Sequence, residues 1–471
     1  MAAERSASFG HDLRLPNEVL SDVFDLSTEP SYDERPIVKT RNLIRLSGVC
    51  SHWREVTTSS AVLWRFLDIN AGDSVDHLNL LSLHFRNVGD GLLSVRINFA
   101  TGPKCVNSPA GIVKQLFNPA NSSKLRSVAL LHINPRLWST IDNWARDSSL
   151  LPLERLDLSW DFVPKLNNGL LFENSPRLRH ITLRNCLPDV EGMFPLDKIT
   201  SLCAYNLSAI NAISILGKYP QLKEFYFESS PVSSHSSDYR ELLKNASTLS
   251  NLRVLSWTSD ANGNEALLRN YRLPSLQSLK WKGRFTYSTP PIQRQHFFSS
   301  MTDLQRLDCS YDASTVFLWS QLPDLTELII QHIPNEDLAN DCLKRLTIKE
   351  GQTSLLPRLK SLKLTMSQAT VQTTNSVNAI MRVIMSRRVS PHIEGGLLSF
   401  GNWDPDSPHW QSHSRLEYFW LSQPTIPFFW EPSIAFFLHT LIRDGLRVEI
   451  TENWNERPVS IPFRSAYDAL L

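Results

Sequence analysis

A short pattern of apolar residues recurs along the chain from about residue 125. One apolar residue is followed three and five positions later by two more, and ten copies start between residues 125 and 359, about 26 residues apart on average. This spacing is typical of leucine-rich repeats, whose units of roughly 20 to 29 residues each supply one strand. The copies begin at Leu125, Leu153, Leu178, Ile199, Leu222, Leu252, Leu276, Leu304, Leu325 and Leu359, and those at Leu125 and Ile199 are the weakest.

Proline marks the beginning of the same units. Pro152 stands one position before its leading leucine, and Pro176, Pro220, Pro274, Pro323 and Pro357 each stand two positions before theirs. Because proline lacks an N–H and resists continuation of a preceding helix, we expect each helix to give way to a strand here. The last two apolar residues of each copy are two positions apart, the period of one strand face, so they should point into a solenoid.

The positions between and beside these apolar residues should share the concave face of the solenoid, with helices on the convex face. Stacked at the inter-strand spacing of about 4.8 Å, they form a broad surface of mixed charge. Any single one of them is consistent with an ordinary solvated residue, whereas stacked repeats characteristically bind partners on this face. The candidate target-binding residues are Arg155, Asp157, Arg184, Tyr226, Lys280, Lys282, Asp308 and Lys363.

The array is irregular and has a different ending. Only Cys186 occupies the asparagine or cysteine position of the repeat consensus, which predicts uneven curvature. Ser433 to Ile442 predict a helix ended by Gly445, and Leu446 to Ile450 predict a final strand. We expect this segment to cap the open end of the solenoid.

Between residues 11 and 70 the apolar spacing is that of helices. Pro16 suits a helix start, and apolar residues at 16, 19, 20, 23 and 24 share one helical face. The polar stretch from Ser27 to Thr40 predicts a loop, and a second helical stretch follows from Leu43 to Val56. About sixty residues cannot bury all these large groups internally, so we expect Phe24 and its neighbours to be covered by a helix of a partner.

The segments LPNEVLSDVF (residues 15–24) and RLSGVCSHWREVTTSSAVLW (45–64) resemble, in order, the two halves of the F-box motif, with a longer loop than in many F-boxes. The chain is also similar over most of its length to F-box proteins with leucine-rich repeats of the kind expanded in mushroom-forming (basidiomycete) fungi. The residues that follow this layout are 61–64, 92–97, 355–359, 385–388 and 445–450.

The resemblance implies a substrate-receptor subunit of an SCF-type cullin-RING ubiquitin ligase. In that family the F-box binds a linker protein, and through it the cullin, while the repeats bind the protein to be ubiquitinated. Trp53 fits the interface and the core equally well, and Cys50 is expected to be a small buried contact. The residues implied for linker binding or its immediate support are Leu15, Pro16, Leu20, Phe24, Val49, Cys50 and Trp53.

The alternative is a leucine-rich-repeat scaffold or receptor that works outside a ubiquitin ligase. Such a protein would share the solenoid but would have no use for an exposed apolar helix pair at residues 15–64. The sequence does not identify the target protein. It also favours no requirement for phosphorylation, because the arginines of the predicted concave face are scattered among acids.

Charge and composition narrow the class of partner. The 48 Lys and Arg balance the 47 Asp and Glu, so no global field favours nucleic acid or anionic membrane. No basic start with an apolar stretch opens the sequence, and no run of about eighteen apolar residues follows. We therefore expect a cytoplasmic or nuclear protein that binds neither nucleic acid nor membrane.

Signatures of catalysis are missing from the sequence. It contains no GxxxxGK[ST], GxGxxG, GxSxG or HExxH string, and no two cysteines have metal-knuckle spacing. His409 and His413 form an HxxxH, but their neighbours predict a loop. We expect no cofactor and no enzymatic activity in the chain itself.

The predicted architecture is α/β, with a small all-helical N-terminal domain followed by an irregular leucine-rich-repeat solenoid. The expected parts are a tail at 1–10, the F-box at 11–70, a linker or N-terminal capping segment at 71–121, the solenoid with its C-terminal cap at 122–450 and a tail at 451–471.

Overall fold

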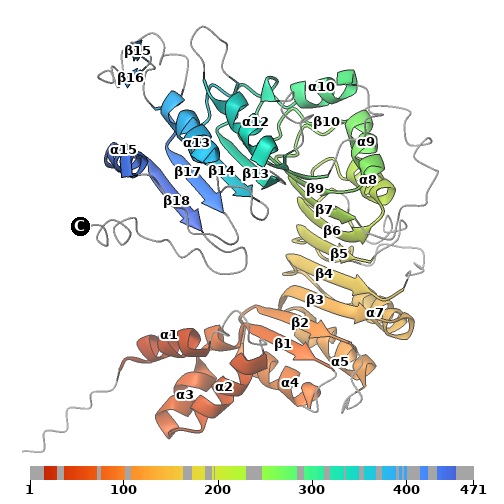
Figure 1. Ribbon diagram of the computed structural model, residues 1–471. Helices are drawn as coiled ribbons and strands as arrows, with labels where there is room; N and C mark the ends of the chain where they lie inside the picture. The colour runs from red at the N-terminus through yellow and green to blue at the C-terminus, as the bar shows by residue number, and fades with distance from the viewer. Residues whose placement is uncertain are drawn as a thin grey trace, which may run out of the picture. The chain divides into compact units, whose positions relative to one another are not determined.

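The chain folds into two compact units, Met1–Ile199 and Thr200–Leu471. The computed structural model (Figure 1) describes residues 15–28, 37–71, 76–100, 108–162, 172–185, 194–195, 197–229, 247–283, 291–311, 319–333, 336–348, 355–366, 374–388, 392–394, 397–399, 414–422 and 432–451. Both units are built from parallel strands with helices on one side of the sheet (Figure 1), and the opposite side is called the open face below.

The first unit begins with four helical segments: α1 (Asn17–Thr28), α2 (Ile37–Ser47), α3 (Ser51–Ser59) and the 3-10 turn η1 (Ala61–Trp64). The prediction of one helical stretch from Leu43 to Val56 is wrong. A turn at Gly48 ends α2, and the Cys50 sulfur starts α3 by accepting a hydrogen bond from the Trp53 amide at 3.4 Å. The predicted loop is also shorter than Ser27–Thr40, because both flanking helices extend into it, and residues 29–36 lie outside the described residues.

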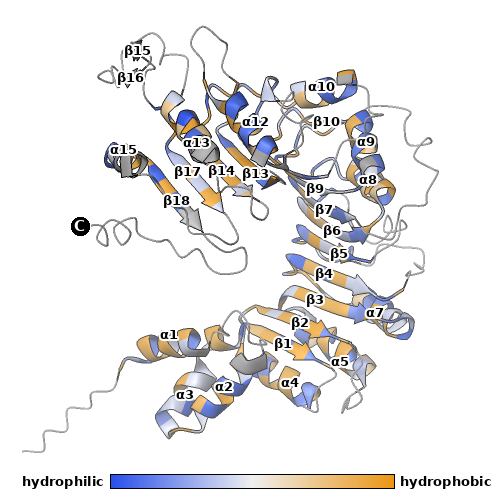
Figure 2. Ribbon diagram, in the orientation of Figure 1, coloured by the Kyte–Doolittle hydropathy of each residue, from blue (hydrophilic) through white to orange (hydrophobic). Residues whose placement is uncertain are grey.

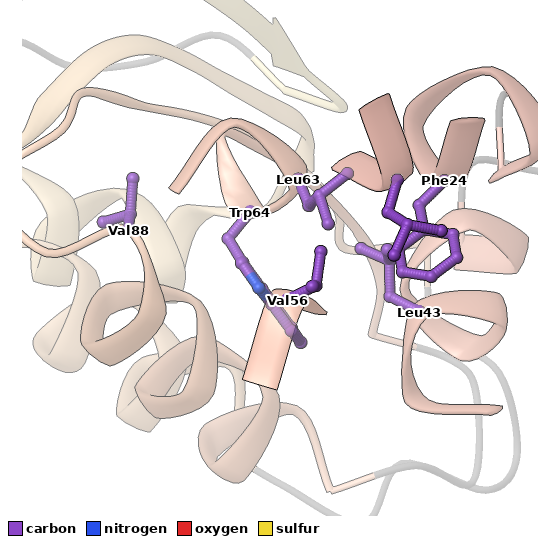
Figure 3. Close-up of a cluster of buried hydrophobic side chains, with 7 residues drawn as sticks. Phe24, Leu43, Val56, Leu63, Trp64 and Val88 are labelled. Atoms are coloured by element: carbon purple, nitrogen blue, oxygen red, sulfur yellow. The ribbon is translucent and has the colours of Figure 1, made fainter. Parts of the chain in front are cut away.

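A single apolar cluster holds these helices together (Figure 3). It comprises Leu20, Phe24, Leu43, Val56, Leu63, Trp64 and Val88. The Trp64 indole N–H donates to the carbonyl of Thr57 at 2.5 Å, so the ring is buried with its polar group satisfied. Val88 comes after α4 (His77–Asn87), so the helical domain completes its core with a segment beyond residue 70.

His84 of α4 adds a polar connection to the same core. Its Nε2 lies 3.2 Å from the Thr40 hydroxyl on α2, and its Nδ1 lies 3.0 Å from the Trp64 carbonyl oxygen. The ring also packs edge-on against the Trp64 indole. Burial lowers the pKa of His84 to about 4, so this interhelical bridge is made by a neutral imidazole at physiological pH.

The parallel sheet of the first unit starts directly after η1. Its strands are β1 (Phe66–Asn70), β2 (Leu93–Asn98), β3 (Leu125–Ile133), β4 (Arg155–Trp160) and β5 (His180–Arg184), in sequence order. The connecting helices are α4, α5 (Pro109–Leu116), α6 (Pro119–Ser122) and α7 (Pro135–Asp147). Regular strand stacking therefore begins about sixty residues before Leu125, where the first copy of the apolar pattern starts. Strand β2 lies within 71–121, the predicted linker or capping segment.

The second unit continues the same design. Its strands, again in sequence order, are β6 (Ser201–Leu207), β7 (Glu224–Ser229), β9 (Val254–Thr258), β11 (Ser278–Lys282), β12 (Arg306–Ser310), β13 (Glu327–Ile333), β14 (Ser361–Met366), β17 (Tyr418–Ser422) and β18 (Arg447–Thr451). Every one of the ten copies of the apolar pattern lies on or directly before a parallel strand, which confirms the prediction of a leucine-rich-repeat architecture.

The helices of the second unit are α8 (Ala209–Lys218), α9 (Ala261–Asn270), α10 (Pro291–Ser299), α12 (Glu336–Leu346), α13 (Thr374–Ser386) and α15 (Pro432–Arg443). Two short pairs, β8 (Ser247–Thr248) with β10 (Tyr271–Arg272) and β15 (His392–Glu394) with β16 (Leu397–Ser399), lie outside the main sheet. The predicted C-terminal helix and strand are confirmed as α15 and β18. Gly445 between them has φ +88°, a conformation that glycine adopts without strain.

The recurrent prolines occupy a defined turn. In the five repeats whose proline stands two positions before the leading leucine, the amide of that leucine donates to the carbonyl three residues earlier, as Leu178 does to Ser175 at 3.1 Å and Leu222 to Tyr219 at 3.1 Å. Proline is then the second residue of a β-turn, where its fixed φ is already correct. The prolines thus mark a hydrogen-bonded turn immediately before five of the strands.

Figure 2 shows how hydropathy follows this design, with apolar residues alternating along the strands. In β7 and β11 alike, the two residues that face the helices are fully buried and the ones between them are half-buried. The three long strands β3, β6 and β13 end in a bulge where His132, Asn206 and His332 adopt positive φ, and the next buried residue returns to the helix side.

Close packing of α8 on α9 generates a first prediction. A Cβ built on Gly263 would lie less than 3.0 Å from the Cβ of Ala209, an atom that cannot rotate away, whereas a Cβ on Gly111 of α5 would meet Leu78 at an ordinary 4.0 Å. We expect Gly263→Ala to destabilise the chain by about 1–3 kcal/mol through overpacking. Gly111→Ala should be neutral or stabilise by up to about 1 kcal/mol. Urea unfolding followed by circular dichroism compares the two, and equal effects would contradict the packing argument.

The buried imidazole of His84 generates a second prediction. Because the folded chain holds this pKa near 4 while an unfolded histidine titrates near 6.5, the unfolded state alone takes up the proton as the pH falls between these values. The native chain should therefore lose about 3 kcal/mol of stability from pH 6.5 to 4 at this site. A His84→Gln variant lacks this loss, so its stability deficit relative to the native chain should narrow with acidification. A deficit that is constant with pH would show that His84 is not held neutral.

Candidate protein-binding surfaces

Helix α1 carries two apolar stripes that face different surroundings. Leu20 and Phe24 are only 6% and 2% exposed and belong to the core of Figure 3. Leu15, two residues before the helix, and Val19, Val23 and Leu26 are between 43% and 71% exposed and recur at intervals of four, four and three. This spacing places them along one side of the helix, next to the buried stripe.

The expectation that Phe24 and its neighbours await a partner is therefore wrong for Phe24 and Leu20 themselves. Residues of the chain's own α2, α3 and η1 cover both side chains, and the Trp53 ring meets the Phe24 ring edge-on at 5.0 Å between centroids. These residues can support a linker-binding surface but cannot contact a partner in this conformation. The sequence pattern did not separate the two stripes, because adjacent positions such as Val19 and Leu20 fall within one broad helical face.

The other residues implied for linker binding lie at the surface or close to it. Pro16, Val49 and Cys50 are exposed, and Trp53 is half-buried against the core. The prediction that Cys50 is buried is wrong, because its sulfur serves as the exposed N-cap of α3. Ile44 of α2 and Val62 of η1 are also exposed apolar residues that the sequence did not single out. Exposed aliphatic side chains gathered on one small domain are typical of a protein contact surface.

On the open face of the first unit, charges pair across neighbouring strands. Asp157 Oδ1 lies 3.4 Å from Arg184 Nε, and Asp68 Oδ2 lies 3.8 Å from Arg96 Nε. Burial raises the pKa of Asp157, and the arginine beside it opposes that rise. Arg155, two residues before Asp157 on the same strand, is exposed. The structure thus places Arg155 and Asp157 of β4 beside Arg184 of β5 on the open face.

In the second unit, the predicted residues Tyr226, Lys280, Lys282 and Lys363 are half-buried on the open face. Asp308 is more deeply placed, with 7% exposure, and accepts a hydrogen bond from the Gln331 amide at 3.0 Å. Burial raises the pKa of Asp308, and Lys280, whose ammonium lies 4.0 Å away, counteracts that effect. Asp308 therefore orders its neighbours on the face more than it presents a contact atom.

The last two strands extend this face with residues that sequence analysis missed. Tyr418 and Trp420 of β17 lie in register with Arg447 and Glu449 of β18. The Tyr418 hydroxyl donates to Glu449 at 2.8 Å, which lowers the pKa of that carboxyl. The sequence does contain a signal for β17, because Leu416, Phe419 and Leu421 repeat the spacing of the apolar pattern after the long gap that follows the copy at Leu359.

Two buried arginines hold in place the segments that precede β14, β17 and β18. Arg387 donates to the carbonyls of Leu346, Leu355 and Leu356, and thereby secures the turn in which Leu356 has φ +57°. Arg388 donates to the carbonyls of Leu416 and Asp444, at the starts of β17 and β18, at 2.6 Å each. Burial lowers the pKa of Arg387 to about 10, so the guanidinium still carries its charge and is satisfied by carbonyl oxygens.

The described residues hold no candidate metal centre, because no group of three or more His, Cys, Asp or Glu side chains gathers there as ligands. His409 and His413 lie outside the described ranges. No helix among the described segments combines the length and the apolar composition that crossing a bilayer requires.

Comparison with known proteins bears on the helical domain first. The F-box-like family model matches residues 12–70, which include α1, α2, α3, η1 and β1. No curated protein matches the chain significantly. Among solved structures, a crystal structure of a TLR13-ssRNA13 complex aligns with 83% of this chain and 62% of its own, at 16% identity and a TM-score of 0.30. The chain spans less than two thirds of that protein.

The family match identifies the helical domain, and the strand register identifies the fold that follows it. The chain contains an F-box-like domain at residues 12–70, followed by a parallel-strand fold of the leucine-rich-repeat kind.

Proposed function

We propose that this protein is the substrate-receptor subunit of an SCF-type cullin-RING ubiquitin ligase. The observation that carries the proposal is the exposed stripe of Leu15, Val19, Val23 and Leu26, which lies on a domain matched by the F-box-like family model. F-box domains typically bind the linker protein of such ligases, and the linker connects them to the cullin. The same surface has no evident purpose in a repeat scaffold that works alone.

The physical argument rests on apolar burial. Covering a Val or Leu side chain that is about half exposed contributes roughly 1 kcal/mol, so four such residues supply a substantial part of a specific contact. Helix packing fits this geometry, because a partner helix laid along α1 would meet residues spaced by three and four. Pro16, Val49 and Cys50 would lie at or near this contact, with Leu20, Phe24 and Trp53 supporting it from within.

The open face of the strands would hold the target protein. The open face of the first unit presents Arg155, Asp157 and Arg184, and that of the second unit presents Tyr226, Lys280, Lys282 and Lys363, with Asp308 ordering its neighbours. Because the F-box core includes Val88 and reaches the first strands through α4, the linker-binding helices and the start of the repeat sheet belong to one packed body. A target held on the sheet would then be kept at high effective concentration near a ubiquitin-conjugating enzyme elsewhere in the complex.

In this proposal the chain performs no bond chemistry and requires no cofactor. Its partners are the linker protein, the cullin through that linker, and a protein target, and it works in the cytoplasm or nucleus, where such ligases act. The alternative function, a repeat scaffold or receptor outside a ubiquitin ligase, is favoured only if the exposed stripe of α1 binds no linker protein.

Substituting the exposed stripe tests the proposal directly. The double change Val19→Asp and Val23→Asp should weaken binding to a purified SCF linker protein by a hundredfold or more, because two carboxylates would have to be desolvated in the contact. The changes Leu15→Ala and Pro16→Ala should weaken it in the same direction. Isothermal titration calorimetry with the full chain measures the effect, and unaltered affinity would refute the assignment.

Two controls make the result specific. Leu151→Asp introduces the same charge at an apolar residue that is 57% exposed in the first unit but lies outside the F-box-like domain, and it should leave linker binding unchanged. Phe24→Ala should instead lower the stability of the domain by roughly 3–5 kcal/mol, as expected for a core ring. A Phe24→Ala variant that folds normally but fails to bind would show that Phe24 contacts the linker after all.

A further inference from the structure

Trp420 is a large aromatic residue on the open face of the second unit. Its neighbours along β17, Phe419 and Leu421, are buried on the helix side, whereas Trp420 is half-buried and lies in register between Lys363 of β14 and Glu449 of β18. No hydrogen bond or ring contact engages its indole within the described residues. An indole that is left partly exposed on a rigid sheet combines a large apolar area with an available N–H donor.

The side chains beside Trp420 are held in place by one another. Glu327 accepts from the Lys363 ammonium at 2.7 Å and lies 3.5 Å from Arg306. The Lys363 ammonium and the Arg447 guanidinium are 5.4 and 5.5 Å from the centre of the Tyr418 ring. This surface is therefore ordered before a partner arrives, which reduces the entropic cost of binding.

Cations outnumber carboxylates on this part of the face. At the open-face positions of β11 to β18 the cations are Lys280, Lys282, Arg306, Lys363 and Arg447, and the carboxylates are Asp308, Glu327 and Glu449. Glu327 and Glu449 are engaged by the network around Tyr418, whereas Lys282 makes no ion pair within the described residues. Lys280 pairs with Asp308 at 4.0 Å, so among the residues that the structure describes Lys282 is left as the unpaired cation of β11, several strands away from Trp420.

We propose that the open face from β11 to β18 binds a target segment that places a large apolar side chain against Trp420 and an Asp or Glu side chain against Lys280 and Lys282. This inference rests on the proposed function and specifies the chemistry of the target. β11 and β17 are four strand spacings apart in the sheet order, or roughly 19 Å. An extended peptide covers that span in about six residues, so the acidic and apolar residues of the target should be separated by about that number.

Selection of random 12-residue peptides displayed on phage, with the purified full chain as bait, tests the inference. Enriched sequences should pair an acidic residue with a Leu, Phe, Met or Trp about six positions away. Synthetic versions of them should bind Trp420→Ala about thirtyfold more weakly, the loss expected of an interface hot spot. Trp420→Phe, which keeps the apolar ring and removes the donor, should give an intermediate loss.

A charge reversal with a matched control completes the test. Lys282→Glu should weaken the acidic peptides about tenfold and improve versions that carry Lys in place of the acid. Lys344→Glu makes the same change on the exposed surface of α12, on the helix side of the same unit, and should have no effect. Enriched peptides without acidic residues, or peptide binding unchanged in both Trp420→Ala and Lys282→Glu, would overturn the inference.

Linker binding is measured on the same variants. Trp420→Ala and Lys282→Glu should bind the SCF linker protein as the native chain does, so a failure at the open face is distinct from a failure of the proposed function. A phosphoserine in place of the acidic residue that bound more than tenfold tighter would show that the face is built for phosphate, and would overturn the choice of a carboxylate.

Discussion

The alternation of side chains along parallel strands is the constraint on which the rest of the structure depends. In each strand two apolar residues must be covered by a helix, and the residues between them are then left on the open face. Because neighbouring strands pair in register, these residues line up in rows across the sheet, as Lys280 does with Asp308 and Lys363 with Trp420. A surface for recognition therefore arises from the same pattern that forms the core.

The helical domain at the N-terminus is subject to a different constraint. Three short helices have too little interior for all their apolar residues, and the chain resolves this in two ways. Phe24 and Leu20 are enclosed by α2, α3 and η1 in a core that also takes Val88 from beyond the domain. The second stripe of α1, with Val19 and Val23, stays at the surface. The shared core makes the domain continuous with the first strands, and the exposed stripe leaves apolar surface of α1 in contact with solvent.

The C-terminal end is held by buried charge as well as by apolar packing. A guanidinium loses its hydrogen bonds to water when it is buried. Arg387 and Arg388 replace these bonds with hydrogen bonds to the carbonyls of four separate segments. These carbonyls belong to the C-terminal end of α12, to the turn at residues 355–356 and to the segments that lead into β17 and β18. Arg388 thus positions the segments that lead into β17 and β18, and with them the aromatic residues Tyr418 and Trp420 of the open face.

Repetition and periodicity were readable from the sequence, because the contacts of each strand depend on residues two apart and each unit repeats the same spacing. Such local relations were enough to predict the ten copies of the apolar pattern, the helix and strand around Gly445 and the two halves of the F-box motif. The additional strands β1, β2 and β17, the deep placement of Asp308 and the network around Tyr418 required the tertiary structure. The division of α1 into a buried and an exposed stripe also required the tertiary structure. Two adjacent apolar residues of α1 look alike in the sequence, and the packing of distant segments such as α3 and Val88 decides which of them is covered.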